Sequence, residues 1–207
     1  MGQPAPPPGR ARAQPRRRPL PEVWVRAVGY AAAAWCLGFA AVSAWQVAHP
    51  ATPQRYAADA SGLAIISVLT GVLKLAGAAV ALAAVLVRPG PSRRSRQLLG
   101  VALWGAFGLL ALYSAGNLAI TVGTVGGLLA PSAAWTAAGG VTPKAILYVL
   151  FFLVGAALFG VLALWFHRRH QLRWTSAAAG LAGAPLLLGL LLAVIPAILS
   201  RWGLLAM

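Results

Sequence analysis

Five apolar stretches constrain this chain more than any other feature of its sequence. They cover about residues 26–48, 63–87, 98–121, 145–166 and 177–200. A helix of about 20 residues crosses a hydrocarbon core about 30 Å thick, so each stretch is long enough to span a bilayer. Only 9% of the residues are charged and 60% are hydrophobic, whereas about 25% of a soluble domain is charged. The sequence therefore predicts an all-α fold, a polytopic transmembrane helical bundle of five spans over residues 22–207.

The first 21 residues differ in composition from the rest of the chain. They hold seven prolines and five arginines, three of them adjacent at Arg16, Arg17 and Arg18. Proline fixes φ and removes a backbone donor, which favours an extended chain without packed structure. We expect residues 1–21 to form a disordered, basic, proline-rich cytoplasmic tail whose arginines approach anionic lipid of the inner leaflet.

Basic residues are distributed unequally between the two ends of the spans. Thirteen of the 17 lie in the tail, at the start of the first span, and in the connections after the second and fourth spans. Because cytoplasmic segments are enriched in Lys and Arg, we expect a cytoplasmic N-terminus and an external C-terminus in a bacterial cytoplasmic membrane. The expected membrane-surface anchors in the two connections are Arg93, Arg94, Arg96, Arg168 and Arg169.

The last apolar stretch carries Pro185 and Pro196. Membrane helices tolerate proline when neighbours satisfy the freed carbonyls, so these residues should kink the span or end part of it. A partly re-entrant last span is the alternative.

The counts of acids and cysteines exclude most enzyme classes. Glu22 and Asp59 are the only carboxylates, and they lie at the ends of different spans on opposite sides. Acid–base chemistry by paired carboxylates requires two such groups beside one substrate. Cys36 is the only cysteine, so the chain forms no intrachain disulfide or thiolate metal cluster. His167 and His170 flank two arginines, which disfavours a metal ion between them. We expect no catalytic residue, no metal and no cofactor.

Lys74 is the one charged residue deep within a span. Its helical rise places it roughly 16 Å from one end of the second stretch and about 20 Å from the other. A lysine at that depth cannot extend to either headgroup layer, so it should face the bundle interior. Ionisable residues inside a membrane are functional candidates. The alternative is a structural lysine bonded to neighbouring hydroxyls and carbonyls.

Counting by depth predicts polar neighbours for Lys74. Ser67 and Thr70 share its helical face at spacings of three and four residues. In the next, antiparallel span, Tyr113 is nearly level with Lys74 and Asn117 lies one turn further out. We expect Lys74, Thr70, Ser67, Tyr113 and Asn117 to bind a ligand in a polar pocket open to the outside, with hydroxyl and amide groups around the lysine.

Two further expectations concern packing and the connections. Helices should approach closely at small residues four positions apart, such as Gly77 with Ala81, Ala156 with Gly160, and Gly180 with Ala184. The glycine-rich string that starts at Thr121 should leave the third span as the start of a long external loop over about residues 122–143. Among the tryptophans, only Trp35 lies well inside a span.

The strings TGVLKLAGA at 70–78 and LYSAGNL at 112–118, the arginine-rich connection between them and the Trp135 loop resemble a known family. It is a set of small bacterial integral membrane proteins that share a domain of unknown function. The resemblance covers about residues 24–169. It implies a multi-span membrane protein and includes the region around Lys74, but it implies no reaction, substrate or catalytic residue.

These observations favour a non-catalytic accessory or structural component of the membrane. The alternative is a protein that binds or transports a small solute or anion through the pocket around Lys74. The expected partners are the lipid bilayer, its anionic inner-leaflet lipids and other membrane proteins. Nucleic acid is excluded as a partner because the basic residues lie between spans instead of on one folded face.

Overall fold

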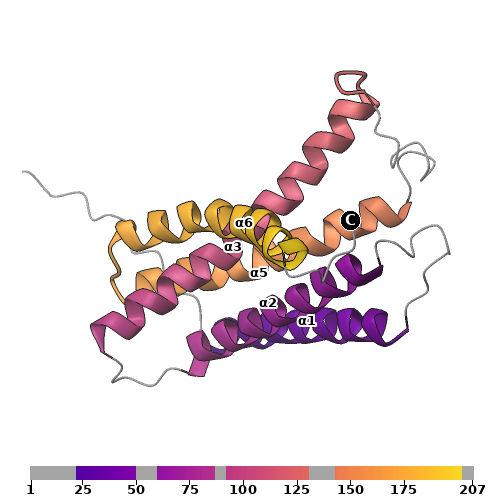
Figure 1. The fold of residues 1–207 in the computed structure, drawn as a ribbon. Helices are drawn as coiled ribbons and strands as arrows, with labels where there is room; N and C mark the ends of the chain where they lie inside the picture. The colour runs from indigo at the N-terminus through magenta and orange to yellow at the C-terminus, as the bar shows by residue number, and fades with distance from the viewer. Residues whose placement is uncertain (1–21, 50–59, 87–91, 131–142, 202–207) are drawn as a thin grey trace, which may run out of the picture.

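The computed structural model describes residues 22–49, 60–86, 92–130 and 143–201, and Figure 1 shows that they are almost entirely helical. Five helices follow in order, namely α1 (Glu22–Ala48), α2 (Ala60–Leu86), α3 (Arg93–Val125), α5 (Pro143–Arg169) and α6 (Trp174–Arg201). The expected all-α fold is confirmed. The proline-rich tail over residues 1–21, with its three adjacent arginines, lies outside the described residues.

Four of these helices, α1, α2, α3 and α5, are long and apolar enough to cross a membrane. The fifth crossing, by α6, stays a prediction. Helix α6 runs from Trp174 to Arg201 without a break, so Pro185 does not end it.

Helix α3 extends beyond its apolar stretch at both ends. It begins at Arg93 because Ser92 caps it, with the Ser95 N–H donating to Ser92 Oγ at 3.2 Å. It continues to Val125, so the expectation of a loop from residue 122 is wrong. Gly127 then adopts a φ of 71°, and the Leu128 N–H donates back to the Gly123 carbonyl. This left-handed glycine is a common way to end a helix.

Helices α1 and α2 pack together as an antiparallel hairpin (Figure 1). The start of α1 meets the end of α2, because a Cβ atom placed on Gly29 would lie 2.3 Å from a Val85 methyl. Near the middle of the hairpin, a Cβ on Gly77 would lie 3.1 Å from Cys36 Sγ, and Ala81 is fully buried. The predicted close approach at Gly77 and Ala81 is confirmed.

Helices α3, α5 and α6 form the second group. A Cβ on Gly160 of α5 would lie 3.1 Å from the Phe107 ring of α3, and these two helices are antiparallel. Helix α6 runs parallel to α3 and approaches it so closely that a Cβ on Gly180 would lie 2.6 Å from both Trp104 Cβ and the Val101 carbonyl oxygen. The small residues thus set the distance between these helices, as predicted.

The two groups meet mainly through α1 and α5. Phe159, Leu162 and Phe166 of α5 are almost fully buried and belong to the core. By contrast, α2 contacts α3 only slightly, and the last part of α3 projects beyond its neighbours (Figure 1). Helices α2 and α3 are therefore only loosely packed against each other.

Candidate functional site

Lys74 is buried, with 8% of its surface exposed, and this confirms that it faces the protein interior. Its ammonium lies over three aromatic rings, with Nζ at 4.6 Å from the ring centre of Trp35, 4.8 Å from that of Phe39 and 4.7 Å from that of Phe152. We call these three rings the aromatic cage. A cation over an aromatic face is attracted by the ring quadrupole when the separation is within about 6 Å.

The cage is assembled from two helices other than that of the lysine. Trp35 and Phe39 are four residues apart on α1 and therefore share a helical face. Phe152 comes from α5 and forms a T-shaped contact with each of the two α1 rings. The Trp35 indole N–H donates to the Phe151 carbonyl oxygen at 3.2 Å, which fixes the orientation of the Trp35 ring. Lys74 of α2 therefore contacts both groups of helices at once.

The polar residues that were expected beside Lys74 do not surround its ammonium in the structure. In the described part of the chain its ammonium contacts rings instead of hydroxyl or amide groups. Tyr113 packs its ring against Phe152 at 4.6 Å and is 38% exposed. The Asn117 side-chain amide donates to the Tyr113 carbonyl at 2.8 Å, so it satisfies its own helix. Thr70 is half-buried.

The expected cluster therefore needs a correction. The side chain of Ser67 lies outside the described residues, and the Asn117 side-chain amide bonds within α3. The physical reason is the packing of α3 against α5 and α6, which moves it away from α2. Lys74 and Tyr113 both lie beside Phe152, so they are at a similar level along the bundle, but α1 and α5 supply the rings around the ammonium and α3 does not.

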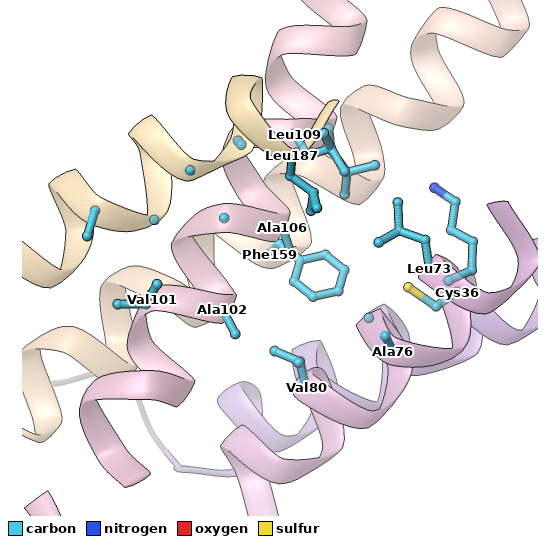
Figure 2. Close-up of a pocket in the computed structure, with 18 of the residues that line it drawn as sticks. Cys36, Leu73, Ala76, Val80, Val101, Ala102, Ala106, Leu109, Phe159 and Leu187 are labelled. Atoms are coloured by element: carbon cyan, nitrogen blue, oxygen red, sulfur yellow. The ribbon is translucent and has the colours of Figure 1, made fainter. Parts of the chain in front are cut away.

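A cavity of about 340 Å³ occupies the space between α2, α3 and α6. Figure 2 shows Phe159 of α5 between Ala102 and Ala106 on one side and Ala76 and Val80 on the other. Lys74 and Trp35 belong to its wall. Apart from this lysine, the wall consists almost entirely of apolar and small residues, so the cavity is not the polar pocket that the sequence predicted. Its volume is at the lower end of the range for small-molecule sites, about 300–1,000 Å³.

The five described anchor residues divide into two sets. Arg93, Arg94 and Arg96 lie in the first turn of α3, and Arg168 and Arg169 end α5. Arg169 forms an ion pair with Glu22 at the start of α1. The start of α1 and the end of α5 therefore lie at the same end of the bundle, as the charge distribution predicts.

Sequence reasoning missed the aromatic cage. The signal was present, because Trp35 is thirteen residues after the start of α1 and Lys74 is twelve before the end of α2, which places the two side by side in an antiparallel pair. The contribution of Phe152 required knowledge that α5, and not α3, packs beside α1.

Comparisons with protein-family models, curated proteins and solved structures find no match to this chain. The resemblance to small bacterial membrane proteins therefore stays a prediction. In the described residues, no group of three His, Cys, Asp or Glu side chains is arranged to hold a metal ion.

Proposed function

We propose that this chain is a non-catalytic accessory or structural component of the bacterial cytoplasmic membrane. The observation that carries the proposal is the enclosure of Lys74 by the aromatic cage, since this uses the one cation at mid-depth to join three helices. A buried cation is costly unless it is satisfied, and the three rings satisfy this one within the protein, so the lysine needs no ligand.

The same proposal includes five spans with the N-terminus inside, and contacts with lipid and with other membrane proteins. The ion pair between Glu22 and Arg169 supports this topology because it brings together two of the ends that the basic residues assign to one side. Exposed Trp24 and Trp174, at the starts of α1 and α6, suit the headgroup level at that end.

Replacing the lysine by an apolar residue tests the structural role. In Lys74→Met, the side chain keeps most of its length and loses the charge whose burial is costly, so the folded bundle should keep its thermal unfolding midpoint within a few degrees. The matched control is Leu75→Met, next to it on α2 and half exposed. Both variants should also yield as much folded protein as the wild type.

Liposomes that contain the purified protein provide the decisive measurement. If the protein is an accessory component, liposomes that contain it should release trapped chloride and phosphate no faster than protein-free liposomes do. Release that the wild type accelerates and Lys74→Met abolishes would overturn the accessory role and establish transport.

A second candidate function is the binding of a small solute or anion at Lys74. It is favoured by the cavity of about 340 Å³ with this lysine in its wall. Glu22 is bonded to Arg169 instead, so in the described residues no carboxylate balances the charge of Lys74. Because the lining is apolar, the fitting solute has an apolar body and one negative group, such as a medium-chain carboxylate.

The second candidate can be tested with the carboxylate itself. Decanoate should stabilise the protein in nanodiscs more than decanol does, and Lys74→Met should remove that difference. Ala102→Phe should fill the cavity and block both ligands, whereas Ala115→Phe, at an exposed position outside the cavity, should block neither. Equal stabilisation by decanoate and decanol in the wild type would exclude this candidate.

A further inference from the structure

A second, polar pocket of about 120 Å³ lies between the start of α3 and the turn that joins α5 to α6. We call it the arginine pocket. Its wall contains three arginines and a histidine together with two glutamines and a leucine, namely Arg93, Arg96, Gln97, His170, Gln171, Leu172 and Arg173. The two contributing segments are far apart in the sequence, so the fold brings this set together.

The turn that forms one wall is held in a defined conformation. The Leu172 N–H donates to the His167 carbonyl at 3.1 Å. The Leu172 side chain also packs against α3 at Gly100, where a Cβ atom would lie 2.5 Å from Leu172 Cδ1. Gln171 has a φ of 49°, which is uncommon for a residue other than glycine. Its side-chain amide donates to the Arg168 carbonyl at 3.2 Å. The position of Arg173 relative to α3 is therefore fixed by packing.

The charge of this pocket is not balanced within the described chain. Two carboxylates are present in the whole sequence, and one of them, Glu22, binds Arg169 outside the pocket. Burial first, and then the nearby Arg96 and Arg169, hold the pKa of His170 below its ordinary value of 6.5. The part of this lowering that comes from Arg96 and Arg169 reflects a positive field, which also attracts an anion.

We propose that the arginine pocket binds a phosphate group. Guanidinium groups present planar pairs of donors that match phosphate oxygens, and three arginines line this pocket together with Gln97 and Gln171. The phosphate belongs to an anionic phospholipid headgroup or is free inorganic phosphate. The neighbouring Trp174 is 65% exposed, and a tryptophan so placed is typical of the headgroup level, which favours the lipid.

This inference goes beyond the proposed function, because it assigns a ligand to the end of the bundle that Lys74 does not reach. The phosphate proposal would still hold if the aromatic cage proved to have no structural role. Loss of phosphate binding likewise leaves the accessory role of the chain unaffected.

The test uses the purified full chain in a non-ionic detergent and three probes, dioctanoyl phosphatidic acid, dioctanoyl phosphatidylcholine and inorganic phosphate. Arg96→Gln and Arg173→Gln each remove one guanidinium from the pocket. Arg168→Gln is the matched control, because Arg168 is exposed at the same end but does not line the pocket. Calorimetric titration gives the dissociation constants.

Phosphatidic acid should bind the wild type more tightly than phosphatidylcholine does. Each pocket variant should weaken its binding by about tenfold or more, since a hydrogen bond to a charged group is lost, and the control should change it less than twofold. Binding of inorganic phosphate with the same dependence on Arg96 and Arg173 identifies free phosphate as the source. Binding of the lipid alone identifies the headgroup.

A variant that binds no ligand could also have failed to fold, so the unfolding temperature of each variant is measured without ligand. Without ligand, Arg96→Gln should unfold at the same temperature as the wild type or higher, because it removes repulsion between like charges. A lower unfolding temperature, or equal losses of binding in Arg96→Gln and Arg168→Gln, would overturn the proposal.

Discussion

The aromatic cage and the arginine pocket both concentrate positive charge where the described chain supplies no carboxylate. In the cage a single ammonium is enclosed by three rings of the protein, and little of it reaches solvent. In the pocket several guanidinium groups surround an open polar space. The difference lies in what surrounds each charge: the protein itself encloses the cation inside the bundle, whereas the pocket at the end stays open to the phosphate group that we propose.

Reversal of the charge at Lys74 should give the largest effect. In Lys74→Glu, a carboxylate would face the electron-rich faces of the cage rings without a partner. We expect about 3–5 kcal/mol of destabilisation, the usual cost of a buried uncompensated charge, whereas Lys74→Met should change little. Thermal or denaturant unfolding in detergent measures both. Equal tolerance of Glu and Met would mean that water enters the cage.

The close contact of α3 with α6 provides a matched pair of glycines. Gly180→Ala would place a Cβ atom 2.6 Å from Trp104 Cβ, while a Cβ on Gly183 has nothing within 4 Å. We expect Gly180→Ala to cost about 1–3 kcal/mol, as overpacking does, and Gly183→Ala to be neutral or mildly stabilising. Because α6 positions the turn with Arg173, only Gly180→Ala should also weaken phosphatidic acid binding. Equal effects of the two substitutions would contradict the packing described.

The coupling between Lys74 and Phe152 should be smaller. A double-mutant cycle of Lys74→Met and Phe152→Leu keeps apolar volume in the cage but removes the interaction between cation and ring. The expected coupling energy is about 1–2 kcal/mol. The same lysine variant combined with Phe107→Leu, in the core but outside the cage, should give coupling near zero. Unfolding free energies of the four proteins in each cycle provide the test.

The pH dependence from His170 should be the smallest effect. The folded chain holds the pKa of this histidine below 6.5 because of burial and then of Arg96 and Arg169. The unfolded chain therefore binds more protons as the pH falls from 6.5 towards the folded pKa, and stability decreases across that range. His170→Gln should remove this contribution to the slope. Bound phosphate should weaken it, because an anion beside His170 raises its pKa. Unfolding temperatures on both sides of pH 6.5 measure the slope.

The sequence was sufficient to predict the helical class, because it follows from the length and register of the apolar stretches. Counting residues from the start of α1 and from the end of α2 could have shown that Trp35 and Lys74 lie at the same level. Sequence did not reveal which helices are neighbours. Phe152 faces Lys74 only because α5 packs beside α1, and the arginine pocket exists only because Leu172 packs against Gly100. Such choices depend on the shapes of many small side chains at once.

The rings of the aromatic cage come from two helices that are far apart in the sequence, and this has a consequence for biosynthesis. Two of its rings belong to α1 and are already made when α2 leaves the ribosome, but Phe152 follows only with α5. A lysine at the centre of an inserting helix costs about 2.5–3.5 kcal/mol on translocon scales. We therefore expect the two α1 rings to cover Lys74 while α2 enters the membrane, and Phe152 to complete the enclosure only after α5 has been made.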